Sequence, residues 1–503
     1  MLAVNLFFCL ALFDPKPHTG GDNASYIILA ESILRLGDGY SDNITPGTSQ
    51  PHTQYPFGYP LLLTPVVLLF GRSVVAFKFF SIALALGCVA LFSLLVKPML
   101  RPVQWAVLTL AVALNPVIID YSHWILSEIS FLFFSLLSFK LFMDSEERRN
   151  GRTSARFWLA LLSIAFTAHI RTIGLGFALA GFAYYLLRFS WRRLVVFTLA
   201  LSLFIAPWMI RNHLVREKGA DSYVKLLLLK SVYTPDQGYM GASDLLARVA
   251  NNVRIYSTSE VARVILGSEN VWGKSKAVLP FSVAATLLVL VGLIGNLILR
   301  VRILELYTLV YLGVILIWPD VVSDVRYLMP IIPLILLYLA DGVTFTIRLL
   351  RPKAAGGVTP AAVVVLLVVS IGLVAQIARV PANLNMIGRF LDGDRYAGYP
   401  VNWRHLFQAA DWVKQNTPES SVVTVRKPRL FYLHTGRKVN GYPFTTDRDS
   451  VFAVLSRTDY VVIDAVSGTT YRYLIPAMQE HKANFKGEFV LQNPFTAVVK
   501  VLP

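Results

Sequence analysis

Long apolar segments separated by short polar connections make up the first 380 residues of the chain. Most of these segments are close to the roughly 20 residues that an α-helix needs to cross a bilayer. The pattern predicts a membrane domain, residues 1–380, with about eleven transmembrane helices. The first segment is shorter than a span requires, and we expect that the start of the chain is truncated or assigned late. The predicted spans are 1–13, 73–96, 103–120, 126–143, 155–170, 173–188, 193–210, 279–299, 303–319, 327–347 and 359–379.

The apolar stretch Pro56–Gly71 is interrupted by Pro60 and Pro65, and we predict that it is an interfacial helix rather than a span. With the N-terminus inside, short inside loops then hold most of the basic residues, as the positive-inside rule requires. If this stretch were counted as a span, every later loop would lie on the opposite side of the membrane. The short outside loops hold only Arg171 and Arg326. The inside loops hold Lys97, Arg101, Arg148, Arg149, Arg152, Arg156, Arg188, Arg192, Arg193, Arg300, Arg302, Arg348, Arg351 and Lys353.

The pattern changes after Val380, where helix-like and strand-like stretches alternate. Residues 403–415 form an amphipathic helical pattern, while 421–425, 459–464 and 495–501 are typical of β-strands. We therefore predict a small soluble α/β domain over residues 381–503, on the outer face. The predicted fold is an all-α polytopic membrane domain followed by this domain.

Composition supports the membrane assignment and limits the alternatives. The 503 residues are 55% hydrophobic and only 15% charged, with a net charge of +17. The basic residues lie between apolar runs, so membrane topology and anionic lipid explain the charge better than nucleic acid does. Cys9 and Cys88 both lie in apolar segments and indicate neither a disulfide framework nor a metal site.

The outer loop 14–72 carries the main catalytic candidate. It is too long for a simple connection, and its Gly20-Gly21-Asp22 sequence precedes an amphipathic helical pattern over residues 23–35, which we expect to lie on the membrane surface. We take Asp22 as the candidate catalytic base. The alternative is that Asp22 only caps this helix, since Asp is a favoured N-cap residue.

Three further charged residues stand at predicted outer ends of spans. Glu128 is a second catalytic candidate because an acid at membrane depth is costly, although an acid also stabilises a helix start. Arg326 and Arg171 are candidates for phosphate binding, because the guanidinium presents a planar fork of donors. Either arginine could instead snorkel or pair internally, Arg326 with Asp324 or Asp320. The long outer loop 211–278 suggests no chemistry of its own.

These stretches, in this order, resemble the integral-membrane class C glycosyltransferases. The stretches are Gly-Asp-Asn-x-x-Tyr at 21–26, Gln-Tyr-Pro-Phe-Gly-Tyr-Pro-Leu at 54–61 and Arg-Tyr-Leu-Met-Pro at 326–330. Within that class the chain is most similar to the ArnT-like and protein O-mannosyltransferase-like group, over residues 1 to 350. The aminoarabinose transferases of the family have a Lys where this chain has Tyr55, which argues against aminoarabinose as the sugar.

The resemblance implies a polyprenyl-phosphate-sugar donor, an acceptor outside the cytoplasmic membrane, and a base in the first outer loop, which corresponds to Asp22. An acid of the second outer loop corresponds to Glu128. We take His52, Tyr55 and Tyr26 as candidate substrate-binding residues. An inverting transfer needs a carboxylate that accepts the acceptor proton and cations that stabilise the departing phosphate.

Several alternatives remain open at this point. Arg326 could neutralise the phosphate without a metal, but Asp22 with Glu128 could also hold a divalent cation. The acceptor could be a glycan, a lipid or a protein. A transporter or flippase of a lipid-linked sugar would instead place ionisable residues at mid-membrane and often show inverted repeats, which this sequence does not show. A non-catalytic membrane scaffold is the third alternative.

Overall fold

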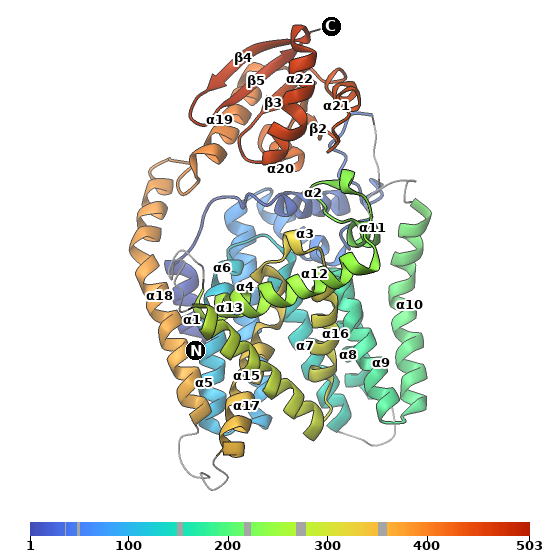
Figure 1. Cartoon of the computed structure of the whole chain (residues 1–503), viewed down its shortest axis with the longest axis vertical. Helices are drawn as coiled ribbons and strands as arrows, with labels where there is room; N and C mark the ends of the chain where they lie inside the picture. Colours follow the sequence, from blue (N-terminus) through green and yellow to red (C-terminus); the bar gives the residue numbers. More distant parts are fainter. Residues whose placement is uncertain are drawn as a thin grey trace.

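The protein has a long helical part and a small α/β part stacked at one end of it (Figure 1). The computed structural model describes residues 1–35, 37–47, 51–147, 154–215, 223–267, 278–350 and 360–502. Five of the basic residues that we predict on the inner side of the membrane are not among the described residues: Arg148, Arg149, Arg152, Arg351 and Lys353. Parts of the loops 14–72 and 211–278 are outside them as well.

Each predicted span corresponds to a helix or a pair of helices in the long part. They are α1 (Leu2–Ala11), α4 (Val74–Val96), α5 (Pro102–Ala113) with α6 (Pro116–Ser122), α7 (Ser127–Glu147), α8 (Ala155–Ile170), α9 (Leu175–Leu187), α10 (Trp191–Val215), α15 (Val278–Leu299), α16 (Ile303–Ile317), α17 (Ile332–Leu350) and α18 (Pro360–Leu391). Among the described residues, five apolar helical stretches are long enough to cross a membrane, or six with the bent α5–α6 pair, and shorter apolar helices accompany them. The chain is a multi-pass membrane protein, and the number of eleven crossings stays a prediction.

The predicted span 103–120 is broken in two by local sequence. Asn115 ends α5 and caps α6, because its side-chain oxygen accepts hydrogen bonds from the backbone N–H groups of Val117 and Ile118, and Pro116 occupies the first helical position. The two halves are bent by 44°. After the break, α6 lies nearer the end of the bundle that carries the α/β part (Figure 1).

Two helices of the first long loop, α2 (Asp22–Leu34) and α3 (Gly58–Phe70), lie at that same end, and α2 runs beneath the α/β part (Figure 1). The expectation that α2 rests on a membrane surface is wrong. Nine of its thirteen residues are buried, because one face packs into the membrane domain through Tyr26 and Ile27 and the other packs into the C-terminal domain through Ala24 and Ile28. The apparent amphipathic pattern reflects two protein neighbours rather than lipid and water.

Glycine permits the close contact that fixes α3. A side chain at Gly58 would place its Cβ 2.6 Å from the backbone carbonyl of His169 at the end of α8. Only glycine lets the two backbones approach this closely. The contact holds the segment before α3, which includes Tyr55, beside the end of α8.

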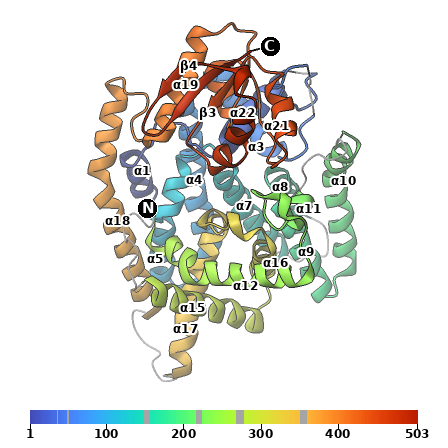
Figure 2. The same cartoon turned by 45° about the horizontal axis from the view of Figure 1, so that its top comes forward.

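The loop that follows α10 forms an arm across the bundle. It contains α11 (Tyr223–Leu228), η3 (Pro235–Gln237), α12 (Ala242–Ile255), a π-helical turn η4 (Tyr256–Glu260) and α13 (Val261–Leu266). The longest of these, α12, crosses the helices of the bundle (Figure 2) and is fastened to the end of α16, where Asn252 donates to the carbonyls of Leu316 and Trp318.

The C-terminal domain is a five-stranded sheet with helices, as predicted. The strand order is β2-β1-β3-β5-β4, in which β2, β1 and β3 pair in parallel and β5 is antiparallel to both of its neighbours, β3 and β4. The sequence pattern found β1, β3, β5 and α19, and missed β2 and β4. The elements are α19 (Val401–Asn416), β1 (Val422–Thr424), α20 (Pro428–Thr435), β2 (Lys438–Asn440), α21 (Arg448–Leu455), β3 (Tyr460–Ile463), η8 (Thr470–Leu474), α22 (Ile475–Glu480), β4 (Phe485–Leu491) and β5 (Thr496–Val501).

The first long loop fastens this domain to the membrane domain. Ile44 accepts a 3.0 Å backbone hydrogen bond from Val439 of β2, and Asp42 forms a 2.8 Å ion pair with Arg429 of α20. Ile28 and Ile44 belong to the hydrophobic core of the C-terminal domain. The helix that begins with Asp22 is therefore held between the two parts of the protein.

Candidate active site

A cavity of about 780 Å³ lies at the end of the bundle that faces the C-terminal domain. Its polar end is formed by the α2 start, the end of α8 and the turn before α17, and its other side is apolar. Polar lining residues include Gly20, Asp22, Tyr26, Gln54, Tyr55, Arg171, Ser323, Asp324, Arg326 and Tyr327. Apolar lining residues include Ile173, Leu175, Leu179, Val310, Val314 and Ile315.

Asp22 lies in this cavity as the first residue of α2. Gly21 is the residue that precedes the helix, with a φ of 94° that favours glycine, and α2 has no side-chain cap. The interpretation of Asp22 as an N-cap is therefore wrong. Its carboxylate instead accepts a 2.9 Å hydrogen bond from the Tyr55 hydroxyl on Oδ1 and a 2.9 Å ion pair from Arg326 Nη2 on Oδ2. The Asp22 side chain is 30% exposed, so it is accessible from the cavity.

Arg326 joins the two predicted carboxylates. Its Nη2 donates to Asp22, and its Nε donates to Glu128 Oε1 at 2.5 Å. Arg171 Nη1 also donates to Glu128 Oε1, at 2.5 Å, and to the Ser127 hydroxyl at 3.1 Å. Residues from four separate parts of the chain thus form one charged network.

Glu128 differs from Asp22 in its access to the cavity. Its side chain is 1% exposed and is absent from the cavity lining, whereas Asp22 and both arginines line it. A carboxylate can be buried when it is paired and hydrogen-bonded. Here two guanidinium groups provide the pairing. The contacts of Glu128 favour a role in holding the arginines.

Arg326 does pair internally, as the alternative held, but with Asp22 and Glu128 rather than with Asp324 or Asp320. Asp324 pairs with Arg263 at 3.3 Å and uses its carboxylate to cap the backbone N–H of Arg326, while Asp320 accepts from Asn251 at 2.6 Å. Among the described residues, Arg326 Nη1 and Arg171 Nη2 and Nε have no protein acceptor. These donors belong to residues that line the cavity.

Three aromatic side chains of the first loop pack together beside Asp22, which Tyr55 contacts directly. Tyr55 lies between Tyr26 and His52, with ring centroids 5.1 Å from each, and His52 accepts the backbone N–H of Tyr55 at 2.9 Å. Tyr26 bonds to the Ser127 hydroxyl at 3.1 Å. Burial raises the pKa values of Tyr26 and Tyr55, which therefore keep their protons and act as donors or neutral partners. His52 supports Tyr55 from behind rather than lining the cavity.

Sequence reasoning missed two basic groups close to Asp22. The His18 ring stacks on Trp124 with centroids 3.9 Å apart, and burial lowers the pKa of His18 to about 4, so the imidazole is neutral at pH 7. Lys427 of the C-terminal domain donates to the carbonyl of Gly20 at 3.3 Å. Neither residue belongs to a local sequence pattern that could have identified it, because each comes close to Asp22 only in the folded protein.

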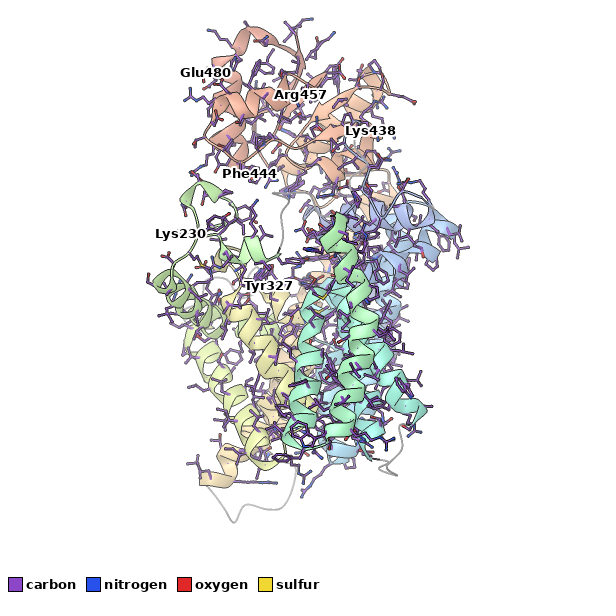
Figure 3. All side chains as sticks on the ribbon, turned by 90° about the vertical axis from the view of Figure 1, so that its right-hand side faces the viewer. Lys230, Tyr327, Lys438, Phe444, Arg457 and Glu480 are labelled. Atoms are coloured by element: carbon purple, nitrogen blue, oxygen red, sulfur yellow. The ribbon has the colours of Figure 1, made fainter. Side chains whose placement is uncertain are left out.

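The turn before α17 closes the cavity on the side of the arm. Trp318 Nε1 donates to the Tyr327 hydroxyl at 3.2 Å, and both rings line the cavity. Tyr327 lies at the end of the bundle that faces the C-terminal domain (Figure 3).

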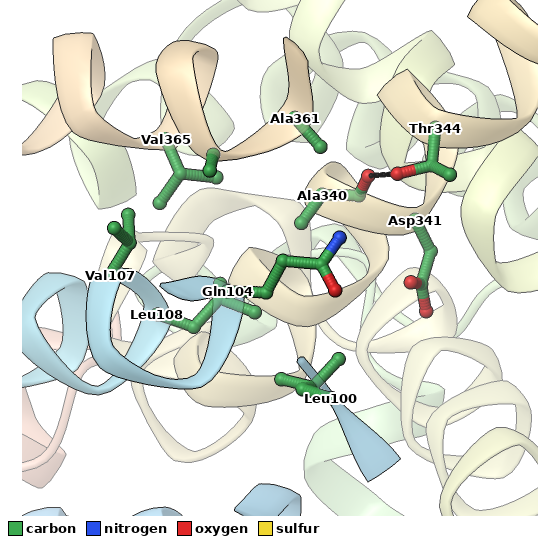
Figure 4. A pocket seen from close by; sticks show the side chains of 10 residues that line it. Leu100, Gln104, Val107, Leu108, Ala340, Asp341, Thr344, Ala361 and Val365 are labelled. Carbon is green, nitrogen blue, oxygen red and sulfur yellow. Dashed lines mark hydrogen bonds between the residues drawn. The ribbon is translucent and has the colours of Figure 1, made fainter. Parts of the chain in front are cut away.

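A group of metal ligands does not appear in the described part of the chain, and a second cavity is small. No three His, Cys, Asp or Glu side chains are grouped so that they could hold a metal ion there. A small cavity of about 10 Å³ lies between α5, α17 and the start of α18, at the opposite end of the bundle from the C-terminal domain, with Gln104, Asp341 and Thr344 on its wall (Figure 4). That volume holds about one water molecule, too little for a sugar donor.

Comparisons with known proteins agree with this architecture. Residues 55–215 match the family described as dolichyl-phosphate-mannose-protein mannosyltransferase. No curated protein sequence matches the chain. The structure matches that of ArnT from Cupriavidus metallidurans in the apo state, with a TM-score of 0.56 and 14% identity over 99% of this chain and 96% of that chain.

Two further structures give similar values. ArnT from Cupriavidus metallidurans bound to undecaprenyl phosphate matches with a TM-score of 0.55 and 14% identity, over 99% of this chain and 96% of that chain. The Archaeoglobus fulgidus oligosaccharyltransferase, tethered with an acceptor peptide containing the NVT sequon, matches with a TM-score of 0.53 and 13% identity, over 100% of this chain and 74% of that chain. The resemblance seen in the sequence is confirmed, and the chain has the fold of the integral-membrane class C glycosyltransferases.

Proposed function

We propose that the protein is an inverting glycosyltransferase that moves a sugar from a polyprenyl-phosphate donor to an acceptor hydroxyl at the outer face of the cytoplasmic membrane. The observation that carries the proposal is Arg326, which joins Asp22 to Glu128 and leaves Nη1 unpaired among the described residues at a cavity wall. A carboxylate and phosphate-binding donors are the two groups that this reaction requires.

The donor phosphate would bind to Arg326 and Arg171. Both guanidinium groups line the cavity, and both are fixed from behind by Glu128, which makes it a positioning residue in this proposal. Donors fixed before the reaction stabilise developing charge without reorganisation. In this proposal, arginine side chains rather than a divalent cation neutralise the charge of the leaving phosphate.

The polyprenyl chain would occupy the apolar side of the cavity. Leu175 and Leu179 of α9 and Val310 and Val314 of α16 form this side, and Leu179 is 60% exposed at the lipid-facing surface of the bundle. A lipid chain can thus run from the arginines to the bilayer without crossing polar surface. Undecaprenyl phosphate in the neighbouring ArnT structure supports a ligand of this class.

Asp22 would act as the general base. As the acceptor oxygen attacks the anomeric carbon, its proton moves to the Asp22 carboxylate, and the bond between that carbon and the phosphate oxygen breaks. The bonding electrons leave with the polyprenyl phosphate, whose charge Arg326 and Arg171 stabilise. Attack opposite to the leaving group inverts the configuration. Tyr55 and Tyr26 would contact the sugar or acceptor at the cavity wall, with His52 supporting Tyr55.

A direct test is transfer of radiolabel from a panel of polyprenyl-phosphate sugars by the purified full-length protein, with membranes of the source organism as acceptor. We expect transfer from at least one donor, and competition by undecaprenyl phosphate. Movement of the intact labelled donor across proteoliposomes without cleavage would instead favour a flippase. Lack of both activities would contradict the proposal.

A further inference from the structure

The carboxyl end of strand β1 in the C-terminal domain carries two adjacent cations, Arg426 and Lys427. In parallel sheets the carboxyl ends of the strands are where ligands usually bind. Here that end faces the membrane domain, with Phe444 on the underside of the C-terminal domain (Figure 3). The two cations also precede α20, whose first N–H groups and dipole favour an anion.

Lys427 is directed at the catalytic loop. Its Nζ lies 3.3 Å from the carbonyl oxygen of Gly20, which lines the cavity, and 5.8 Å from the centre of the Trp403 ring. A Cβ at Gly21, the residue before Asp22, would lie 3.9 Å from the same Nζ. The C-terminal domain thus brings an ammonium group next to the loop that carries the proposed base.

Arg426 is held in place by neutral groups. Its Nε donates to the Thr469 hydroxyl at 2.7 Å, and its guanidinium lies over the Phe444 ring at 4.7 Å from the ring centre. Burial and then the charge of Arg426 lower the pKa of Lys427.

Within the described residues, neither cation has a carboxylate within the 4.0 Å of an ion pair. The charges of Asp22 and then of Asp464, at the end of β3, act on Lys427 from beyond that distance, and Asp464 also interacts with Arg426. Two other cations between the two domains are paired, Arg429 with Asp42 at 2.8 Å and Arg472 with Asp236 at 3.1 Å. Two adjacent cations without a direct ion-pair partner favour the binding of an anionic ligand.

The same domain also contacts the opposite wall of the cavity. The Tyr473 hydroxyl donates to the carbonyl of Tyr233, a lining residue from the arm, at 3.3 Å. The C-terminal domain therefore borders the cavity from the side of Gly20 and from the side of Tyr233. An acceptor that approaches Asp22 between these two contacts would meet Lys427.

We propose that Lys427 and Arg426 form an acceptor subsite that binds a phosphate group of the acceptor and so presents a neighbouring hydroxyl to Asp22. A phosphate suits this place better than a carboxylate because its additional oxygens can accept from the guanidinium, the ammonium and the helix start together. The donor phosphate is a separate ligand, at Arg326 and Arg171. The subsite rests on the proposed function for its role, but its binding can be measured without sugar transfer.

The test is phosphate binding to the purified full-length protein, saturated with undecaprenyl phosphate so that the donor arginines are occupied. Glycerol 3-phosphate is titrated as a soluble probe, and phosphatidic acid in neutral mixed micelles as a lipid-borne probe. Lys427→Gln removes the charge, Lys427→Arg keeps it, and Lys500→Gln removes an exposed cation on β5 of the same domain. Melting temperature is recorded for each variant as a measure of folding.

We expect Lys427→Gln to bind the probe about ten-fold more weakly, the usual effect of one lost charge-assisted hydrogen bond. Lys427→Arg and Lys500→Gln should bind like the parent. Lys427-dependent binding of either probe supports the subsite and identifies the source of the phosphate. Equal binding by Lys427→Gln and the parent, or no binding of either probe to the parent, overturns the subsite. If the parent protein transfers no sugar, that result bears only on the proposed function.

Discussion

Replacing Arg326 by Lys separates charge from geometry in the proposed donor site. The substitution keeps one positive charge but loses the fork that bonds to Asp22 through Nη2 and to Glu128 through Nε. A single ammonium at the end of a flexible stem cannot reproduce both bonds and also leave a donor for the ligand.

The magnitude follows from the bonds that are lost. A hydrogen bond to a charged group contributes about 1.5–3 kcal/mol, which corresponds to roughly ten-fold or more in affinity for the donor phosphate. Loss of a fixed donor to a developing oxyanion costs about 100-fold to 1,000-fold in rate. We therefore expect undecaprenyl phosphate to bind at least ten-fold more weakly and single-turnover transfer to slow by about 100-fold.

Arg263 provides a matched control. It also contacts two carboxylates, Glu260 at 2.9 Å and Asp324 at 3.3 Å, and its side chain is 27% exposed against 26% for Arg326, but it is absent from the cavity lining. Arg263→Lys should leave donor binding and transfer close to those of the parent. Equal loss in the two variants, or no loss in either, would refute the reasoning that Arg326 holds the donor phosphate.

Three further predictions address the lipid path, the C-terminal domain and the topology. Gly176→Leu fills the apolar side of the cavity, where a Cβ would already lie 3.1 Å from Val310, so undecaprenyl phosphate should bind at least ten-fold more weakly while a short-chain phosphate binds as before. Gly313→Leu, on an exposed position of α16 with open space around it, is the control. Burial raises the pKa of the Asp464 carboxyl to about 6. The unfolded protein therefore releases this proton at a lower pH than the native protein does, and the free energy of unfolding falls as the pH rises from about 4 to 6. The thermal unfolding of Asp464→Asn should lack this loss of roughly 2–3 kcal/mol, and an equally steep decline in the variant would assign it to other groups. A reporter fused after residue 503 should be outside and one inserted in 146–152 inside, and the reverse pattern would place Asp22 on the opposite face.

The membrane part of the fold could be predicted because hydrophobic runs report directly on burial in lipid or protein. The break at Asn115 was not predicted, since its polar side chain lies within an otherwise continuous apolar run. The prediction for α2 failed for a different reason. Its polar and apolar faces are typical of a helix between water and lipid. In the structure one face instead contacts a domain encoded almost 400 residues later, which no local pattern can show.

The candidate site was predicted in part. Asp22 was selected from the first outer loop, and Glu128, Arg171 and Arg326 as charged residues at the ends of spans; the structure joins the four in one network. Their separation along the chain means that only the fold could show which of them touch. Lys427 was missed because a lysine at the end of a short strand in a soluble domain is ordinary until its contact with Gly20 is seen.

The central claim is that Asp22 accepts the proton of the acceptor, and Asp22→Asn tests it most directly. The amide oxygen can still accept from Arg326, and the amide N–H can donate to the Tyr55 hydroxyl, but the amide cannot accept a proton at neutral pH. The measurement is single-turnover sugar transfer by the purified variant, with undecaprenyl phosphate affinity and melting temperature recorded beside it, and Asp38→Asn in the same loop as the control. We expect transfer about 100-fold to 10,000-fold slower than in the parent, with donor binding and folding retained. Transfer by Asp22→Asn at near the parent rate would contradict the assignment of Asp22 as the base.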